Sequence, residues 1–184
     1  MKTHAAPLAE NVPLLSQFES PRLCAFSDRL AFRTAGPMAF LDLTDRIHDA
    51  VARSGVDHGI VNLQCLHTSA ALVVNEDEPL LHRDFETLLA SLAPRDASWQ
   101  HDRFDIRTVN MTPEETPNGH AHARALVLRS TESLNVVNGH LTLGRWQRVF
   151  FLECDESRDR AVSVLVLGAG RPIPTGKRSD APCA

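Results

Sequence analysis

The first half of the chain carries apolar residues at helical spacing in two places. In residues 43–51, apolar side chains repeat at about 3.6 residues and Gly55 follows as a stop signal, which predicts a helix. A second helix is expected from Pro79 to just before Pro94. Between the two helices, residues 59–66 and 71–74 are expected to be strands, and residues 22–33 two short strands around Ser27 and Asp28. The expected buried stripe of the second helix consists of Leu81, Phe85, Leu88, Leu89 and Leu92.

The last third of the chain has the pattern of successive strands, which are expected at residues 125–128, 134–137, 141–143, 146–153 and 161–167. Asn138 and Gly139 are typical of a type I′ hairpin turn, because both central residues of that turn need a positive φ. Helices thus come early and antiparallel strands late, which favours an α+β fold with mostly antiparallel sheet and two main helices. The polar segment 93–119 has little periodicity, as is typical of functional or disordered loops.

Composition indicates one globular domain, because 184 residues with 43% hydrophobic content can form a single core. Residues 1–17 are expected to be a flexible leader, 18–170 the domain, and 171–184 a flexible tail. The net charge of −4 argues against nucleic-acid and anionic-membrane partners. No apolar run is long enough to span a bilayer or to serve as a signal peptide, so a cytoplasmic location is expected.

Nine histidines are the unusual feature of the composition. In Gly119-His120-Ala121-His122, an extended backbone would point both imidazoles to one face, which is half of a common zinc site. The alternative is two surface histidines beside a loop. His67, at the end of an expected strand, is either a ligand or acid-base group or a core histidine.

Three further polar groups each have two interpretations. His101-Asp102 is either a ligand with its supporting carboxylate or an exposed loop pair. Asn75 and Glu76 follow a strand and either line a cleft or form an ordinary turn. Asp84 lies beside the apolar stripe of the second helix, where a charge is normally solvated.

Four ordered blocks of the sequence resemble the YjbQ-type family. They are LHTSAALVVNEDEP (66–79), His101-Asp102, Ala121-His122 and NGHLTLGRWQ (138–147). The similar stretch runs from about residue 18 to residue 168. The chain departs from the family pattern after Glu76, at residues 128–131, at Arg145 and in the loop 103–119, and these departures affect the substrate pocket more than the fold.

The resemblance implies an α+β subunit that assembles as a homotrimer and has its motif histidines in a cleft able to hold a divalent metal ion. Carried over by position, these histidines are His67, His101 and His122, whereas His120 has no family counterpart. The implied activity is a weak, secondary thiamine phosphate synthase. That reaction joins hydroxymethylpyrimidine pyrophosphate to thiazole phosphate and releases pyrophosphate.

The implied reaction assigns roles to further residues. Release of pyrophosphate requires neutralisation of its charge by a metal or by basic side chains, and Arg124 and Arg145 are the candidate phosphate contacts. Glu76 is the candidate acid-base or metal-orienting group, and Asn75 and Asp84 complete the candidate catalytic set. Imidazole ligands favour zinc, with magnesium as the alternative. The other functions considered are a metal-dependent hydrolase and a non-catalytic trimer that binds a small ligand or a metal.

Overall fold

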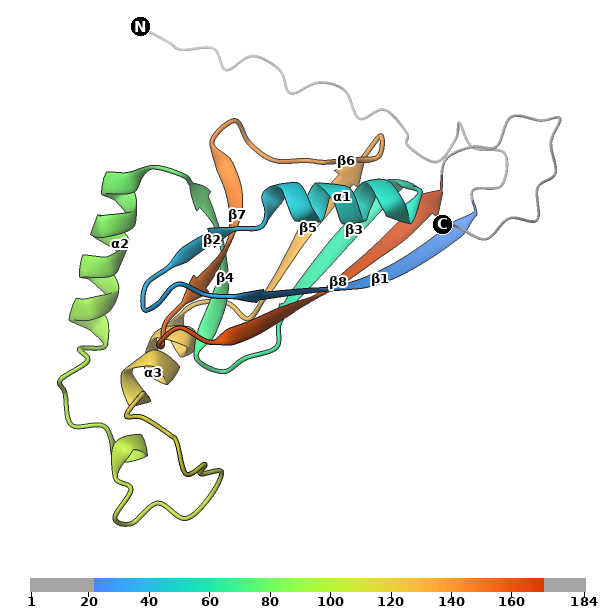
Figure 1. Cartoon of the computed structure of the whole chain (residues 1–184). Coiled ribbons are helices and arrows are strands. Elements are labelled where there is room, and N and C mark those ends of the chain that lie inside the picture. The colour runs from blue at the N-terminus through green and yellow to red at the C-terminus, as the bar shows by residue number, and fades with distance from the viewer. Residues whose placement is uncertain (1–21, 171–184) are drawn as a thin grey trace, which may run out of the picture.

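The computed structural model describes residues 22–170, so the leader and tail expected at 1–17 and 171–184 lie outside the described residues. The described chain forms two antiparallel sheets and three α-helices, as the α+β expectation requires (Figure 1). None of the helices within residues 22–170 has the length and apolar character needed to cross a membrane.

The larger sheet has five strands in the order β1-β8-β3-β5-β6. Its members are β1 (Leu23–Arg33), β8 (Asp159–Gly170), β3 (Val56–Cys65), β5 (Thr131–Val137) and β6 (His140–Leu141). The expectation of two short strands in 22–33 is wrong, because β8 pairs with β1 along its whole length, from Leu23 opposite Ala169 to Arg33 opposite Asp159. The hairpin turn is confirmed, with φ of 53° at Asn138 and 75° at Gly139.

The smaller sheet has three strands in the order β2-β7-β4, namely β2 (Phe40–Asp42), β7 (Gln147–Glu153) and β4 (Ala70–Glu76). Its central strand, β7, is buried from Val149 to Glu153. An acidic side chain at the end of such a strand needs a partner in the interior. Glu153 is therefore the natural centre of a buried polar site.

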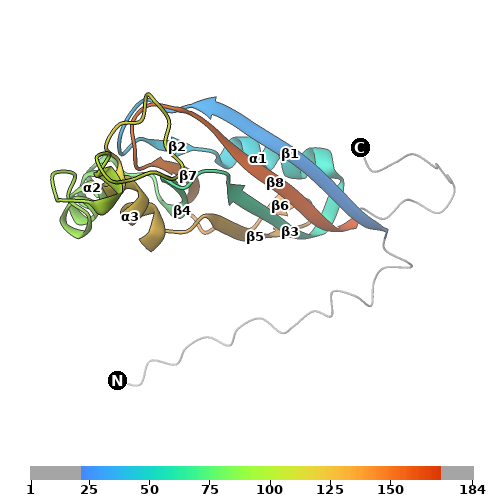
Figure 2. The same cartoon turned by 90° about the horizontal axis from the view of Figure 1, so that it is seen from below.

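Helix α1 (Thr44–Ser54) packs Ile47, Ala50 and Val51 into the core on one face of the larger sheet. Asp42 lies just before its start, and its carboxylate accepts a hydrogen bond from the Thr44 N–H at 2.8 Å. Gly55 ends it in the left-handed conformation, with φ of 68°. No described helix packs on the opposite face of this sheet (Figure 2), where Ile60 and Leu165 are exposed.

Helix α2 (Pro79–Leu92) packs on one face of the smaller sheet, where its His82 ring contacts Phe40 of β2 and Phe150 of β7. Glu78 caps it by accepting hydrogen bonds from the Leu80 and Leu81 N–H groups. The expected buried stripe is only partly correct: Leu89 is buried, but Leu88 and Leu92 are 54% and 59% exposed. The sheet therefore covers only part of the apolar face of the helix.

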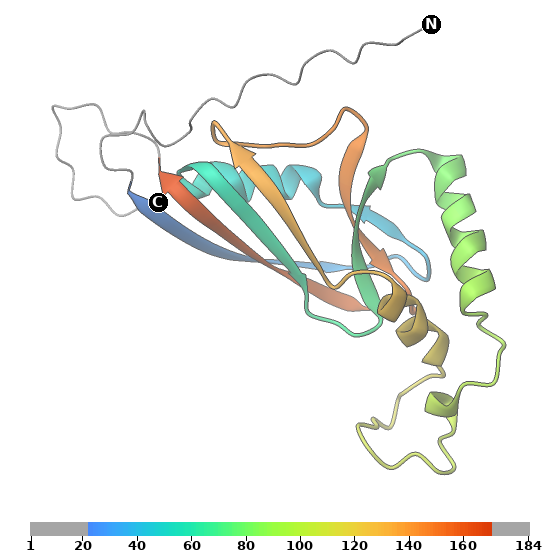
Figure 3. The ribbon, with the colours of Figure 1, turned by 180° about the vertical axis from the view of Figure 1, so that it is seen from behind.

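Residues Gly119–Val127 form helix α3. The strand expected at 125–128 and the extended backbone considered for 119–122 are therefore wrong. The Ala121 N–H donates to the Asn118 carbonyl oxygen, and the alanine-rich segment that follows favours helix. His120 and His122 therefore do not share a face. The helix lies beside the start of β4 (Figure 3) and contacts the short 3₁₀ turn η1 (Gln100–Asp102).

Candidate polar cleft at the histidine pair

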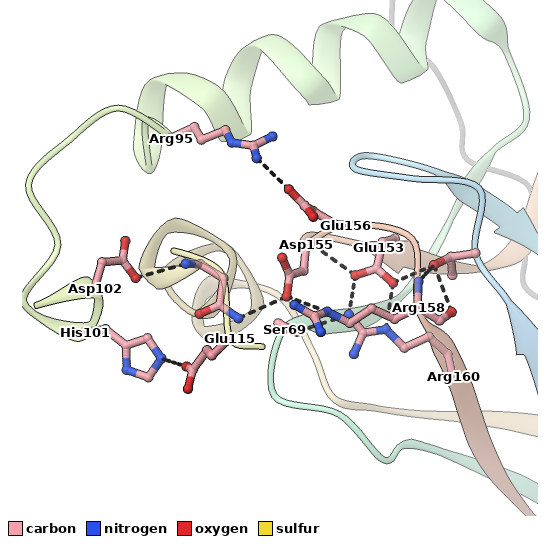
Figure 4. A network of polar contacts seen from close by, with 12 residues as sticks. Ser69, Arg95, His101, Asp102, Glu115, Glu153, Asp155, Glu156, Arg158 and Arg160 are labelled. Atoms are coloured by element: carbon pink, nitrogen blue, oxygen red, sulfur yellow. Dashed lines mark hydrogen bonds and ion pairs between the residues drawn. The ribbon is translucent and has the colours of Figure 1, made fainter. Parts of the chain in front are cut away.

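Four segments meet around a polar cleft of about 460 Å³: the turn before β4, the loop 101–118, the start of α3, and the β7–β8 loop. Figure 4 shows the network of contacts along it. The cleft is lined by Thr68, Ser69, His101, Arg107, Asn110, Thr112, Glu115, Asn118, His122, Asp155, Arg158 and Arg160. The two sheets and α3 thus bring together residues that are up to 92 positions apart in the sequence.

Two imidazoles face each other in this cleft. The rings of His101, from η1, and His122, from the first turn of α3, have centroids 4.5 Å apart and planes tilted by 60°. Nε2 of His101 is buried without a hydrogen-bond partner in the described chain and lies 3.6 Å from Oε1 of Glu115. Burial, followed by the neighbouring His101, lowers the pKa of His122, so this ring is neutral near pH 7.

Asp102 positions this pair without bonding to either ring. Its Oδ1 accepts hydrogen bonds from the N–H groups of Asn118 at 2.9 Å and Gly119 at 2.8 Å. These are among the N–H groups that the start of a helix leaves unpaired, and a carboxylate there also interacts favourably with the helix dipole. Because Asp102 follows His101 and Gly119 opens the turn that carries His122, one side chain fixes both histidines.

A buried ion pair forms the inner wall of the cleft. The Arg160 guanidinium donates from Nε to Oε2 of Glu153 at 2.7 Å and from a terminal nitrogen to Oε1, and also reaches Oγ of Ser69 at 3.1 Å. Thr34 donates its hydroxyl to Oε2 of the same carboxylate at 2.9 Å. A bidentate pair with these extra hydrogen bonds has its charges satisfied in the interior and holds the guanidinium in one orientation.

Arg158 stands nearer to solvent and is tied to the wall by one atom. Its Nε donates to Oδ2 of Asp155 at 3.0 Å, which also accepts from Nδ2 of Asn118 at 3.0 Å. Burial acts to raise the pKa of Asp155, but the hydrogen bonds and Arg158 outweigh it and leave that pKa below its usual value. Within residues 22–170 no acceptor bonds the terminal nitrogens of Arg158, so they are available to an anion in the cleft.

His67 lies apart from the histidine pair. Its Nε2 accepts a hydrogen bond from the Ala161 N–H at 2.8 Å, so in the neutral ring the proton is on Nδ1. Burial, followed by the positive charge of Arg160, lowers its pKa and keeps it neutral. It lines a neighbouring cavity, whereas His122 lines both spaces.

The two candidate phosphate contacts do not line the cleft of the subunit. Arg124 is buried and donates to the Ala93 carbonyl oxygen at 3.1 Å, which ties α3 to the end of α2. Arg145 is exposed in the β6–β7 loop, with its guanidinium carbon 4.6 Å from the centre of the Trp146 ring.

The candidate catalytic residues also lie elsewhere in the subunit. Asn75 and Glu76 end β4, five and six residues beyond Ala70, which is about 17–20 Å along a strand. Asp84 is exposed on α2. His120 is buried against the interior with a pKa lowered by burial and then by Arg124, and it does not line the cleft.

Several lining residues were not found from the sequence. They are Ser69, Arg107, Glu115, Asn118, Asp155, Arg158 and Arg160. A signal was present in residues 153–160, ECDESRDR, where alternating charges follow directly on a buried strand. Such a run is normally a solvated turn, and only the return of β8 beside β1 and β3 shows that Glu153 and Arg160 are interior.

The histidine pair is a partial fit to a metal site. Within the described residues, no three His, Cys, Asp or Glu side chains are grouped to hold a metal ion. The unpaired Nε2 of His101 beside His122 nevertheless offers two nitrogen donors, which suit zinc better than magnesium. Nε2 of His67 already accepts a hydrogen bond and is not open to a metal in this arrangement.

Comparison with known proteins agrees with the fold. The family model described as "UPF0047 protein YjbQ-like" matches residues 28–169. The chain belongs to the YjbQ-like UPF0047 family. It is 33% identical over 147 residues to a UPF0047 protein of Methanothermobacter thermautotrophicus, covering 80% of this chain and 94% of the relative.

Solved structures of YjbQ-like proteins have the same architecture. A YbjQ-like protein of unknown function from Sulfolobus solfataricus P2 superposes with a TM-score of 0.71 at 30% identity, covering 80% of this chain and 99% of that one. A hypothetical protein from Aeropyrum pernix K1 gives 0.67 at 30% identity, with coverage of 77% and 98%. The family resemblance and the α+β fold expected from the sequence are therefore confirmed.

Proposed function

We propose that this YjbQ-like protein is an enzyme that acts on small phosphorylated substrates in the polar cleft, with thiamine phosphate synthesis as its weak, secondary activity. The observation that carries this proposal is the placement of the neutral His122 ring and the Arg158 guanidinium in one cleft. An arginine fork suits a phosphate, and a neutral imidazole has a lone pair free to bind a divalent cation.

The cleft suits departure of pyrophosphate from the pyrimidine substrate. Terminal nitrogens of Arg158 would neutralise charge as it develops on the leaving group, while Asp155 holds the guanidinium by its Nε. A divalent cation held by His101 and His122, with zinc favoured, would supply further neutralisation of phosphate charge.

A homotrimer remains part of this proposal. Support comes from the uncovered face of the five-stranded sheet, on which Ile60, Leu165 and Leu167 are 37–43% exposed. A sheet face with apolar residues is normally covered by another layer. A neighbouring subunit could supply that layer, and sedimentation at micromolar concentration would distinguish a trimer from a 20.3 kDa monomer.

The test is direct assay of thiamine phosphate from the two precursors, with zinc, with magnesium and with a chelator. We expect loss of product in His122→Asn and in Arg158→Met, partial recovery in Arg158→Lys, and wild-type product in Arg83→Met, which removes an exposed arginine of α2. Release of phosphate without formation of thiamine phosphate would show that the protein is a hydrolase and not a synthase. Tight precursor binding without turnover would replace it by a binding protein.

A further inference from the structure

A second cavity, of about 810 Å³, adjoins the polar cleft. Thr68 and His122 line both spaces, so these two side chains form their common border. The second cavity differs in character, because its walls include Leu66, Trp99 and Leu126 and no acidic or arginine side chain. A molecule at the border would therefore meet charge on one side and apolar surface on the other.

Trp99 is held in one orientation at the wall of this cavity. Its indole Nε1 donates a hydrogen bond to the Pro94 carbonyl oxygen at 2.9 Å. Its Cβ packs against Gly119, where an added Cβ would lie only 2.5 Å away. A half-buried indole fixed at both ends is a preorganised surface for a flat ring, since little conformational freedom remains to be lost on binding.

His67 lines the same cavity and presents a polar group that can only donate a hydrogen bond. The Ala161 N–H occupies its Nε2, which leaves Nδ1–H as a hydrogen-bond donor. An N–H in mainly apolar surroundings discriminates strongly between a ligand that offers an acceptor and one that does not. The cavity thus combines a ring surface with a donor of fixed position, beside the polar side chains of Gln64 and Ser130. The border residue His122 connects it to the arginines.

We propose that the second cavity is a ring subsite in which Trp99 contacts the flat face of the substrate and His67 donates to an acceptor atom of its ring. The phosphate of the same molecule then lies across His122 in the polar cleft. This inference rests on the proposed function only in placing the phosphate of the substrate in the polar cleft. It makes Trp99 a residue that determines which phosphate esters bind, independently of the reaction that follows.

The test is calorimetric titration of the full-length protein with three esters of equal charge: glycerol 3-phosphate, phenyl phosphate and 3-pyridyl phosphate. We expect affinity to rise in that order, with about tenfold between the first two from contact of the ring with Trp99 and about fivefold more from the ring nitrogen. Trp99→Leu should remove the roughly tenfold gain that both ring esters owe to ring contact and leave glycerol 3-phosphate unchanged. The matched control is Trp146→Leu, which removes the other tryptophan, 60% exposed.

A milder variant keeps the test decisive if Trp99→Leu does not fold. Leu126 is 84% exposed at the cavity wall, so Leu126→Gln should fold normally and weaken both ring esters by about threefold. Equal affinity for all three esters, or ring esters unaffected by either variant, would overturn the ring subsite and leave the phosphate cleft standing. Binding of 3-pyridylmethanol that depends on Trp99, with no binding of any phosphate ester, would overturn the proposed function and keep the ring subsite. No binding of any probe overturns both.

Discussion

Oδ1 of Asp102 lies 2.8 Å from the backbone nitrogen of Gly119 and joins the loop that carries His101 to the helix that carries His122. This carboxylate, together with the packing of Trp99 on Gly119, sets the position of one imidazole relative to the other. Asp102, Asn118, Asp155 and the Arg158 guanidinium form one continuous chain of hydrogen bonds that runs past the histidine pair.

Asp102→Ala should lower the free energy of unfolding by about 1–2 kcal/mol, because two N–H groups at the start of α3 lose their acceptor. Asp102→Asn keeps an amide oxygen at the same place and should lose less than half of that amount. Urea unfolding measures both. The imidazole NMR signals of His101 and His122 should move together in the alanine variant, and unchanged signals there would show that the carboxylate does not position the pair.

Gly119→Ala should be destabilising by about 1–3 kcal/mol, because the new methyl group would lie 2.5 Å from Cβ of Trp99 and 2.9 Å from its Cγ. Trp99 fluorescence should shift as the indole is displaced. Gly144→Ala is the control, since its nearest neighbour is the flexible end of Gln147 at 3.2 Å. Equal thermal midpoints for the two variants would contradict the close packing at Gly119.

Arg160→Met should cost about 3–5 kcal/mol of stability, because it leaves the Glu153 carboxylate buried without its cation. Adding Glu153→Gln to that variant should restore part of the loss, and the double-mutant cycle gives the coupling. The exposed pair of Arg33 and Asp159 provides the comparison, with less than about 1 kcal/mol expected for Arg33→Met. Similar losses for both arginines would mean that the inner wall is not rigidly paired.

Stability should fall as the pH is lowered from about 7 towards 5. The pKa values of His67, His120 and His122 are lowered in the fold, by burial first in each case. The unfolded chain therefore binds more protons once the pH passes below the usual histidine value near 6.5, and stability is lost between that value and the lower folded values. In His122→Asn the unfolding midpoint should depend less steeply on pH. An unchanged slope would show that His122 does not contribute to the loss of stability.

Zinc binding should depend on the histidine pair. We expect titration of the metal-free protein with zinc to show one site per chain that is weakened at least about tenfold in His101→Ala and in His122→Ala, because each loses one of two nitrogen donors. His48→Ala, on α1, serves as the control for loss of an imidazole elsewhere. The same zinc affinity in His122→Ala as in the wild type would exclude the pair as the site.

The elements that local sequence determines were predictable, and those that depend on distant partners were not. Helix α1 follows from its spacing and from Gly55, and the turn at Asn138-Gly139 follows from its need for positive φ. Helix α3 is short, and a carboxylate from a separate segment, Asp102, caps its start, so residues 119–128 alone do not distinguish helix from strand.

The sequence predicted some residues of the candidate site and missed others. The resemblance to the family pointed to His101 and His122, which the fold brings together. It did not reveal that Nε2 of His67 is occupied by a backbone N–H of β8, because this contact crosses 94 residues. The arginines of the cleft were missed because their partners, Glu153 and Asp155, are defined by burial rather than by a motif.

The place of β8 between β1 and β3 also affects how the chain is made. Arg33 and its neighbour Asp159 are 126 residues apart, so a ribosome adding about 5–20 residues per second needs roughly ten seconds to supply the partner of β1. During that interval β1, 11 residues long, and one edge of β3 have no native strand to pair with. Unpaired strand edges are templates for pairing with other chains, so this interval is when the growing chain is most exposed to aggregation.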